Sequence, residues 1–248
     1  PHAYYSESKR KAAIGVVIRA VERKMNRMFD RVIHVSAEEE KYALTHKLVN
    51  RNKSVVIANG IQDFEVTKKT NVNPTFINVA RCGYQKNPEL FIGVAECILH
   101  EEESFKFIWV GDGPLLDKCR ALVKEKGIQD SVSFVGYSKE VFGYLENANV
   151  FFSTSRYEGL PFSVIEAMAA KLPVILTNVI GHQELVKDNG ILISSNADLT
   201  SSSTMIAKFT DVLANEKEMG MASYKIFQKK YRVEDMIKKI ERIYDHKW

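Results

Sequence analysis

The chain has 248 residues, enough for one large domain or two small ones, and its apolar share of 45% is ordinary for a globular protein. Its formal charge of +4 is too small to favour a nucleic-acid-binding protein, and no apolar run approaches the roughly 20 residues of a membrane-spanning helix. We see no signal peptide. Three cysteines without a C-x-x-C pair disfavour a disulfide framework or a zinc site and favour a cytoplasmic protein.

The first 60 residues predict helix, strand, helix and strand in turn. Residues 11–29 have apolar side chains at helical spacing and a basic opposite face. The stretch "RVIHVS" predicts a short buried strand, and Ser36 and Glu39 form an S-x-x-E capping box that opens a helix over 37–48. "SVVIANG" predicts a second strand that ends at Asn59-Gly60.

A polar stretch then separates this part from a longer alternating region. Residues 63–74 show no periodicity and predict a linker between two domains. From residue 75 onwards, short apolar strands alternate with helices, which is typical of a doubly wound parallel sheet in an α/β protein. The expected strands are 75–80, 105–111, 131–136, 148–154, 173–177 and 190–194. The expected helices begin at Pro88, run over 114–126, follow Ser138 as a cap, and cover 162–171 and 183–187, with further helices in the last 55 residues.

Ligands of such sheets bind at the carboxyl ends of the strands, so the loops there are the candidate site. In the first loop, "RCGYQKNPEL", Arg81 and Lys86 flank a turn that leads into a helix N-terminus. Two cations beside free helix N–H groups suit an anion, and a diphosphate in particular. The alternative is that both are solvated surface cations.

The next two loops contain glycines. In "VGDGPLL", Gly111 and Gly113 would allow the backbone to approach a ligand closely, although a plain strand–helix turn uses the same residues. The G-x-G-x-x-G dinucleotide fingerprint is not matched, because Leu116 stands at the third glycine position. In "FVGYS", Gly136 would let backbone groups reach the edge of a base.

The fourth loop contains two carboxylates, Glu158 and Glu166, in an E-x7-E arrangement. Glu158 follows a strand, and Gly159, Leu160 and Pro161 lead into a helix whose backbone N–H groups would meet a phosphate. Glu166 has two interpretations. It completes a capping box if Ser163 is the N-cap, and it points at a ligand if the helix begins at 161 or 162. Spacing alone slightly favours the cap.

No metal site or cofactor is expected. The sequence has no D-x-D motif, and its histidines are scattered without the spacing of metal ligands on a helix. A diphosphate bound here would therefore depend on Arg81 and Lys86 for compensating positive charge.

These motifs together resemble retaining glycosyltransferases of family GT4, which have the GT-B fold. "EGLPFSVIEAMAAKLPVILTN" resembles the E-x7-E segment of the family. "VARCGYQKNPELFI" is similar to its diphosphate loop, "FIWVGDGPLL" to its glycine-rich turn, and "VSFVGYSKEV" to its base-reading loop. "IGHQELVKDNGILI" resembles the segment that follows the E-x7-E helix, so the likeness covers about residues 75–195 with the motifs in order.

The resemblance implies roles for these residues. Arg81 and Lys86 would hold the donor's diphosphate and stabilise the departing nucleotide, and Glu158 would lie near the donor sugar. Glu166 would bind the ribose hydroxyls, which reverses the slight preference for a cap. The N–H groups of 159–161 would face phosphate and sugar hydroxyls, with Gly111 at the donor and Gly136 beside the base.

The family also implies a division of the chain. Residues 1–62 would be the last part of an acceptor-binding Rossmann-like domain, 75–230 the Rossmann-like domain that binds a nucleotide-sugar, and 231–248 a C-terminal helix that packs back on the first domain. The glycine-rich loop expected near the start of the first domain is not seen, so we expect a chain truncated at its N-terminus that retains donor binding. In "PHAYY", His2 would approach the donor sugar.

The expected function is therefore metal-independent, retaining sugar transfer from a nucleotide-sugar to a glycan or lipid-linked acceptor in surface polysaccharide synthesis. The alternatives are a GT-B nucleotide-sugar epimerase and a non-catalytic nucleotide-sugar binding module. The basic helix 11–29 would contact anionic lipid at the inner face of the plasma membrane, or it simply has a solvated basic face, which we favour.

Overall fold

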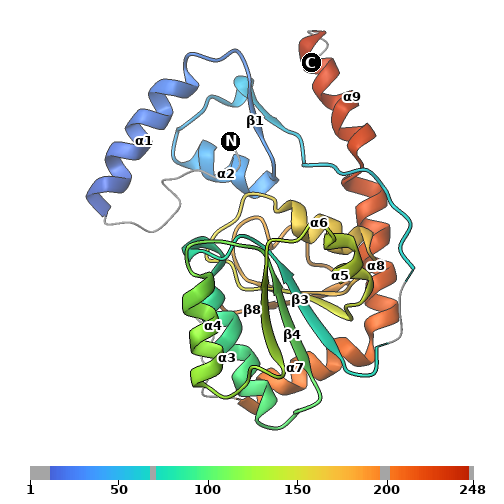
Figure 1. The fold of residues 1–248 in the computed structure, drawn as a ribbon. Helices are drawn as coiled ribbons and strands as arrows, with labels where there is room; N and C mark the ends of the chain where they lie inside the picture. Colours follow the sequence, from blue (N-terminus) through green and yellow to red (C-terminus); the bar gives the residue numbers. More distant parts are fainter. Residues whose placement is uncertain (1–11, 68–70, 196–201, 246–248) are drawn as a thin grey trace.

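The structure is a computed structural model, and it describes residues 12–67, 71–195 and 202–245. A six-stranded parallel sheet forms the larger part of the molecule, with strands in the order β5-β4-β3-β6-β7-β8 (Figure 1). The strands are β3 (Thr75–Val79), β4 (Lys106–Val110), β5 (Val132–Gly136), β6 (Val150–Ser153), β7 (Val174–Thr177) and β8 (Gly190–Ile193). The chain winds outwards from β3 in one direction and from β6 in the other, which confirms the doubly wound α/β sheet.

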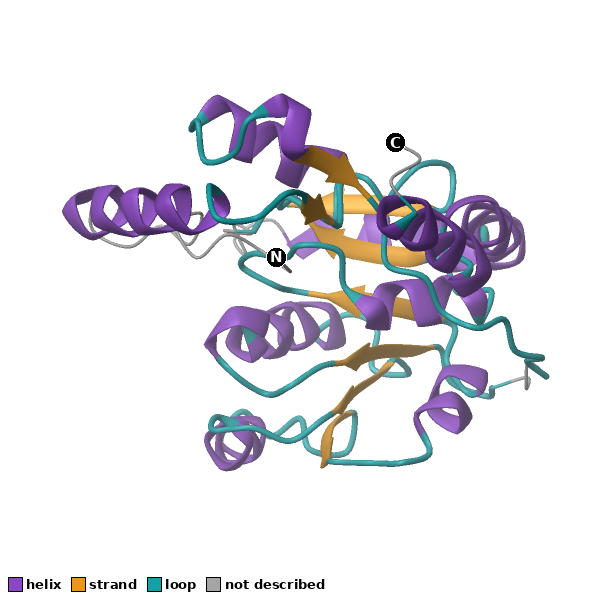
Figure 2. Ribbon diagram, turned by 90° about the horizontal axis from the view of Figure 1, so that it is seen from above, coloured by secondary structure: helices purple, strands orange, loops and turns teal. Residues whose placement is uncertain are grey.

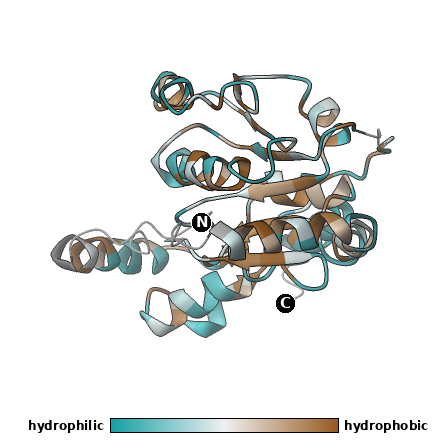
Figure 3. Ribbon diagram, turned by 90° about the horizontal axis from the view of Figure 1, so that it is seen from below, coloured by the Kyte–Doolittle hydropathy of each residue, from teal (hydrophilic) through white to brown (hydrophobic). Residues whose placement is uncertain are grey.

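Helices cover both faces of this sheet (Figures 1 and 2). One face carries α3 (Pro88–Leu99), α4 (Leu116–Glu125) and α7 (Ser202–Ala214), and the other carries α5 (Val141–Glu146), α6 (Phe162–Ala169) and α8 (Glu216–Lys230). Figure 3 shows apolar residues concentrated on the strands and on the inner faces of the helices that pack against them.

Alternation along each strand divides the core into two clusters. On β3, Phe76 packs with α3 and α7, while its neighbour Ile77 packs with α6 on the opposite face. Aromatic rings dominate the first cluster, where the rings of Trp109 and Phe134 stack with centroids 5.5 Å apart. Burial of each large apolar side chain contributes about 1.5–3 kcal/mol, so this core fixes the positions of the loops at the strand ends.

A smaller, two-stranded parallel sheet precedes the large one. Its elements are α1 (Ala12–Asn26), β1 (Val32–His34), α2 (Ala37–Thr45), the 3-10 turn η2 (Arg51–Lys53) and β2 (Ser54–Val56). The predicted cap of α2 is confirmed, because Ser36 Oγ accepts a hydrogen bond from the Glu39 N–H at 3.1 Å. The helix ends at Thr45 rather than at residue 48, since Lys47 takes a left-handed conformation with φ of 53°.

The two sheets contact each other through the carboxyl ends of β1 and β2. Asn59 Nδ2 donates to Leu160 O at 2.7 Å, and the Ala37 N–H at the start of α2 donates to Glu184 Oε2 at 3.0 Å. Further along, Ile61 forms a parallel bridge with Arg232, directly before the last helix α9 (Val233–Tyr244). The Gly60 N–H also contacts Met236 Sδ at 3.3 Å, so the start of α9 lies against residues 60–61.

Some local predictions differ from the structure. The segment 183–187, expected as a helix, is a series of turns, with Gln183 N–H donating to Val179 O at 3.3 Å and Leu185 N–H to His182 O at 3.0 Å. The helix after Ser138 begins only at Val141, and the Ser138 hydroxyl accepts from the Glu140 N–H before it. Among the described residues, no helix combines the length and apolar character needed to cross a bilayer.

Candidate functional site

The loops that follow β3 and β6 meet at the point where the sheet reverses its winding direction. The Arg156 N–H donates to Gln85 O at 2.7 Å, and Gln85 Nε2 donates back to Tyr157 O at 3.0 Å. The Thr154 hydroxyl adds hydrogen bonds to Lys86 O and Asn87 O. This is the position at which open α/β sheets bind ligands, and here the two loops form one connected surface.

Lys86 and Glu158, two of the predicted site residues, form an ion pair within that surface. Lys86 Nζ lies 2.5 Å from Glu158 Oε1, and the two side chains are only 19% and 6% exposed. A pair removed from water in this way holds both groups in one geometry, because separation would leave a buried charge uncompensated. The contact joins residues 72 positions apart in the sequence.

Arg81 lies on the rim of a cavity of about 610 Å³ at the carboxyl ends of β3, β4 and β5. The cavity is also lined by Gly111, Asp112, Gly113, Pro114 and Tyr137. Arg81 is exposed and forms no ion pair with any described residue, so its guanidinium is available to an anion, whereas Lys86 is already paired. Tyr137, a lining residue that the sequence analysis did not select, is 74% exposed and presents an aromatic ring to the cavity.

Gly111 and Gly113, in the loop after β4, lie tightly against the backbone of the loop after β3, whereas the sequence analysis expected them to approach a ligand. A Cβ at Gly111 would lie 2.0 Å from Ala80 O, and one at Gly113 would lie 2.3 Å from Cys82 O. The Cys82 N–H donates to Asp112 O at 2.8 Å, which fixes the two loops together. These glycines therefore place Arg81 against the cavity, in addition to any contact that their backbone makes with a ligand. Gly136 needs no such space, but its φ of 88° favours glycine.

The position of α6 separates the two interpretations of Glu166. The helix begins at Phe162 with Pro161 as its N-cap, so Ser163 lies inside the helix and forms no capping box with Glu166. The Glu166 carboxylate is half-buried and has no hydrogen bond or ion pair with the described part of the chain. Burial raises its pKa above the ordinary value of 4.5.

The segment Gly159–Pro161 is buried between neighbouring loops. Leu160 O accepts the hydrogen bond from Asn59, and a Cβ at Gly181 would lie 2.1 Å from Gly159 O, so the loop after β7 packs directly on this segment. One prediction needs correction: Pro161 has no amide hydrogen and cannot donate to a ligand. Only the N–H groups of Gly159 and Leu160 in this segment can do so.

His182 is a further polar group beside these residues that sequence reasoning missed. Its side chain is fully buried, and Nδ1 lies 2.9 Å from Thr177 O. Burial lowers the pKa of His182, while the nearby Glu158 carboxylate opposes that shift. A neutral ring donates from Nδ1 to the carbonyl, which leaves Nε2 as an acceptor that has no partner among the described residues. The only signal in the sequence is its place in "IGHQELV".

The sequence analysis also did not select Arg156, which holds the loop after β3 in place. Its Nε donates to Tyr84 O at 3.1 Å, its Nη2 donates to Asn87 Oδ1, and its guanidinium stacks 4.7 Å from the centre of the Tyr84 ring. Its position within "STSRYEG" gave no indication of this role, which depends on the neighbouring strand.

No group of three potential metal ligands occurs among the residues that the structure describes. His2, expected near a donor sugar, lies outside the described residues. In the described part of the chain, the site thus combines the exposed Arg81, the buried Lys86–Glu158 pair, the half-buried Glu166 carboxylate and backbone donors.

The fold is that of a GT-B type domain, and comparison with known proteins identifies its family. Residues 61–229 match the model of the family described as "Glycosyl transferases group 1", and the chain belongs to that family.

Several characterised relatives are similar over much of the chain. A "Poly(ribitol-phosphate) alpha-N-acetylglucosaminyltransferase" of Staphylococcus aureus is 29% identical over 188 residues, which cover 74% of this chain and 38% of that protein. An Escherichia coli "UDP-Gal:alpha-D-GlcNAc-diphosphoundecaprenol alpha-1,3-galactosyltransferase" is 24% identical over 262 residues, which cover 98% of this chain and 66% of that protein. The chain thus spans less than two thirds of the length of either relative.

Solved structures share the fold. TarM of S. aureus, crystallised with fondaparinux, alpha-GlcNAc-glycerol and UDP, superposes with a TM-score of 0.85 at 23% identity, covering 98% of this chain and 49% of that one. Anabaena Alr3699/HepE with UDP superposes with a TM-score of 0.81 at 16% identity, covering 99% and 71%.

Proposed function

We propose that the loops after β3 and β6 form the donor site of a retaining, metal-independent glycosyltransferase, which transfers a sugar from a nucleotide-sugar to a glycan or lipid-linked acceptor. The observation that carries the proposal is the buried Lys86–Glu158 pair at the switch point, beside a cavity lined by Arg81, which has no ion pair with any described residue. The proposed division of the chain is 1–62 for the end of an acceptor-binding domain, 63–74 for a linker, 75–230 for the donor domain and 231–248 for the returning C-terminal helix.

In this proposal, cations stabilise the departing nucleotide. Cleavage of the bond between the sugar and the phosphate builds negative charge on the diphosphate and positive charge on the anomeric carbon. Arg81 donates to the diphosphate from the cavity rim, and Lys86 approaches it from the other side. Glu158, which is paired with Lys86, lies beside the sugar. Its carboxylate stabilises the positive charge on the anomeric carbon and orients the sugar hydroxyls.

The ribose and the base of the nucleotide bind at the same ends of the strands. Glu166 accepts hydrogen bonds from the ribose hydroxyls, since its carboxylate is left without a described partner. Tyr137 offers a ring for stacking on the base, with the Gly136 backbone at the base edge. The N–H groups of Gly159 and Leu160 face the sugar and phosphate.

The printed names of the relatives suggest which ligands to test. UDP was bound in TarM and in HepE, and UDP-galactose is the donor named for the E. coli relative. We therefore propose a uridine nucleotide, with uracil as the base. A diphosphoundecaprenol acceptor is named for that same relative, which supports a lipid-linked acceptor.

Calorimetric titration with UDP, GDP and ADP in the presence of EDTA tests the proposal. One nucleotide should bind, and Glu166→Ala should weaken its binding at least tenfold without lowering the melting temperature. Glu125→Ala, which removes an exposed carboxylate at the end of α4, is the matched control and should bind as the wild type does. Failure of all three nucleotides, or binding only after Mg²⁺ or Mn²⁺ is added, would overturn it.

A further inference from the structure

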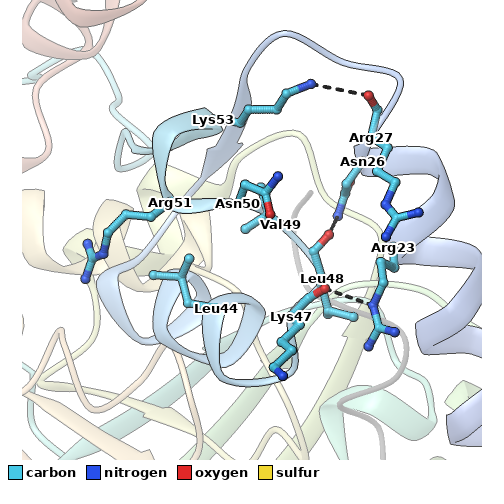
Figure 4. A pocket seen from close by; sticks show the side chains of 10 residues that line it. All are labelled: Arg23, Asn26, Arg27, Leu44, Lys47, Leu48, Val49, Asn50, Arg51 and Lys53. Carbon is cyan, nitrogen blue, oxygen red and sulfur yellow. Dashed lines mark hydrogen bonds between the residues drawn. The ribbon is translucent and has the colours of Figure 1, made fainter.

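A second cavity lies in the N-terminal part of the chain, between α1 and the segment that joins α2 to β2. It has a volume of about 500 Å³ (Figure 4). Its lining consists of Arg23, Asn26, Arg27, Leu44, Lys47, Leu48, Val49, Asn50, Arg51 and Lys53. Five of these ten side chains are cationic and none is acidic, so we call it the cationic pocket.

Two of the five cations hold the walls of the pocket together. Arg23 donates from Nε to Lys47 O at 2.9 Å and from Nη2 to His46 O at 3.0 Å, which ties α1 to the end of α2. Lys53 Nζ donates to Phe29 O at 2.7 Å, beyond the end of α1. Both therefore bind carbonyl groups near helix C-termini, where cations are stabilising.

The other three cations have no such structural partner. The side chains of Arg27, Lys47 and Arg51 form no hydrogen bond or ion pair with any residue that the structure describes. Figure 4 shows them on three separate segments, α1, the turn after α2 and η2, with the Arg51 side chain directed away from the other two. Like charges gathered around one cavity repel each other, and an anion placed among them would relieve that repulsion.

The cationic pocket is remote from the donor site. Its residues lie at the ends of α1 and α2 and therefore beside the amino ends of β1 and β2. The carboxyl ends of these parallel strands face the other way, because Asn59 after β2 contacts Leu160 and Ala37 after β1 contacts Glu184. A ligand in the cationic pocket is thus not the nucleotide of the proposed donor site.

We propose that the cationic pocket binds a phosphate group. Arginine forks pair two N–H donors with two phosphate oxygens, and several cations around one hollow favour a ligand of more than one negative charge over a single carboxylate. The phosphate belongs either to the headgroup of an anionic lipid or to a free phosphate or diphosphate. Met28 and Phe29, which follow α1 and are 80% and 54% exposed, would meet the apolar part of such a lipid.

An NMR titration of the chain with pyrophosphate tests this site. Saturable shifts are expected at the backbone amides of residues 48–50. The triple variant Arg27→Gln/Lys47→Gln/Arg51→Gln should bind at least tenfold more weakly and should unfold at the wild-type temperature, because these side chains support no fold contact. The control Lys225→Gln/Lys229→Gln/Lys230→Gln removes the same charge from exposed positions on α8 and should bind as the wild type does.

A second variant tests whether pyrophosphate binding at the cationic pocket is independent of the donor site. Arg81→Gln should leave the shifts of residues 48–50 unchanged, whatever it does to nucleotide binding. Shifts confined to residues 111–113, or equal affinity in the wild type and the triple variant, would overturn the proposal and leave the donor site untouched.

Vesicle sedimentation distinguishes the two sources of phosphate. Binding to phosphatidylglycerol vesicles but not to phosphatidylcholine vesicles, lost in the triple variant and retained in the α8 control, assigns the site to a lipid headgroup. Pyrophosphate binding without vesicle binding assigns it to a free phosphate. Absence of both overturns the proposal.

Discussion

The Lys86 ammonium lies 2.5 Å from the Glu158 carboxylate, and these side chains come from loops that follow adjacent strands, β3 and β6. The pair joins the two halves of the doubly wound sheet at their reversal point. In the proposed donor site, Lys86 would thus meet a diphosphate with a carboxylate already at its side, whereas Arg81 has no ion pair with any described residue.

Removal of one partner of this pair should destabilise the fold. Lys86→Met leaves Glu158 buried without compensation and should lower the free energy of unfolding by about 3 kcal/mol, measured by urea denaturation. Lys118→Met is the matched control, because the Lys118–Glu89 pair is largely exposed and should be worth about 1 kcal/mol or less. Equal effects of the two substitutions would show that the Lys86–Glu158 pair is solvated.

Arg81→Ala should weaken nucleotide binding while leaving the free energy of unfolding almost unchanged. The side chain is exposed and unpaired among the described residues, so the free energy of unfolding should change by no more than about 0.5 kcal/mol. The loss of charged hydrogen bonds to a diphosphate should weaken nucleotide binding by about 1.5–3 kcal/mol in calorimetry. Lys124→Ala, on the exposed side of α4, should change neither quantity. Unaltered nucleotide affinity in Arg81→Ala would remove Arg81 from the site.

The pKa of Glu166 predicts a pH dependence of donor binding. Burial raises this pKa above 4.5, and only the ionised carboxylate accepts hydrogen bonds from both ribose hydroxyls. Affinity for a nucleotide-sugar, whose diphosphate does not titrate in this range, should rise with pH as Glu166 ionises. Calorimetry from pH 4.5 to 7.5 should show this rise in the wild type, and Glu166→Gln should be flat. A rise that persists in the variant would assign the titration to another group.

The same raised pKa affects stability in the opposite direction. The folded chain holds the Glu166 proton more tightly than the unfolded chain does, so the contribution of this residue to stability falls as pH rises through its folded pKa. Urea unfolding of wild type and Glu166→Gln should therefore show the variant gaining relative stability towards neutral pH. A constant difference between them would contradict the shift.

Gly111 should be intolerant of a side chain. Its Cβ would lie 2.0 Å from Ala80 O at a φ of 141°, so Gly111→Ala must displace the loop that carries Arg81. We expect a loss of more than about 2 kcal/mol in stability together with weaker nucleotide binding. Gly143→Ala, in α5 with nothing within 4 Å of the new Cβ, should instead stabilise the chain by about 0.5–1 kcal/mol. If Gly111→Ala changed neither the free energy of unfolding nor nucleotide binding, the two loops would not be in tight contact.

The sequence predicted the sheet well because its signals are local. Short apolar strands, Pro88 at the first position of α3 and the Ser36 cap each depend on neighbouring residues, and each is found as expected. The helix expected over 183–187 is absent, and the segment instead forms turns closed by local hydrogen bonds such as Leu185 N–H to His182 O.

The candidate site could be predicted from the sequence as a set of loops, but not its internal contacts. Strand ends in a parallel sheet pointed to the loops of Arg81, Lys86 and Glu158, yet nothing local distinguished Lys86, which is paired, from Arg81, which has no ion pair with any described residue. Burial of His182 and the support from Arg156 depend on tertiary packing, so neither was found. The start of α6 at Phe162, one residue before Ser163, excludes the capping box for Glu166 and was ambiguous from spacing alone.

A crystal structure of this chain with the nucleotide that binds it tests the central claim most directly. The diphosphate should lie within hydrogen-bonding distance of Arg81 and Lys86 at the ends of β3 and β6, with the ribose hydroxyls on the Glu166 carboxylate. A nucleotide bound elsewhere, or one that leaves Arg81 and Glu166 without contact, would contradict it.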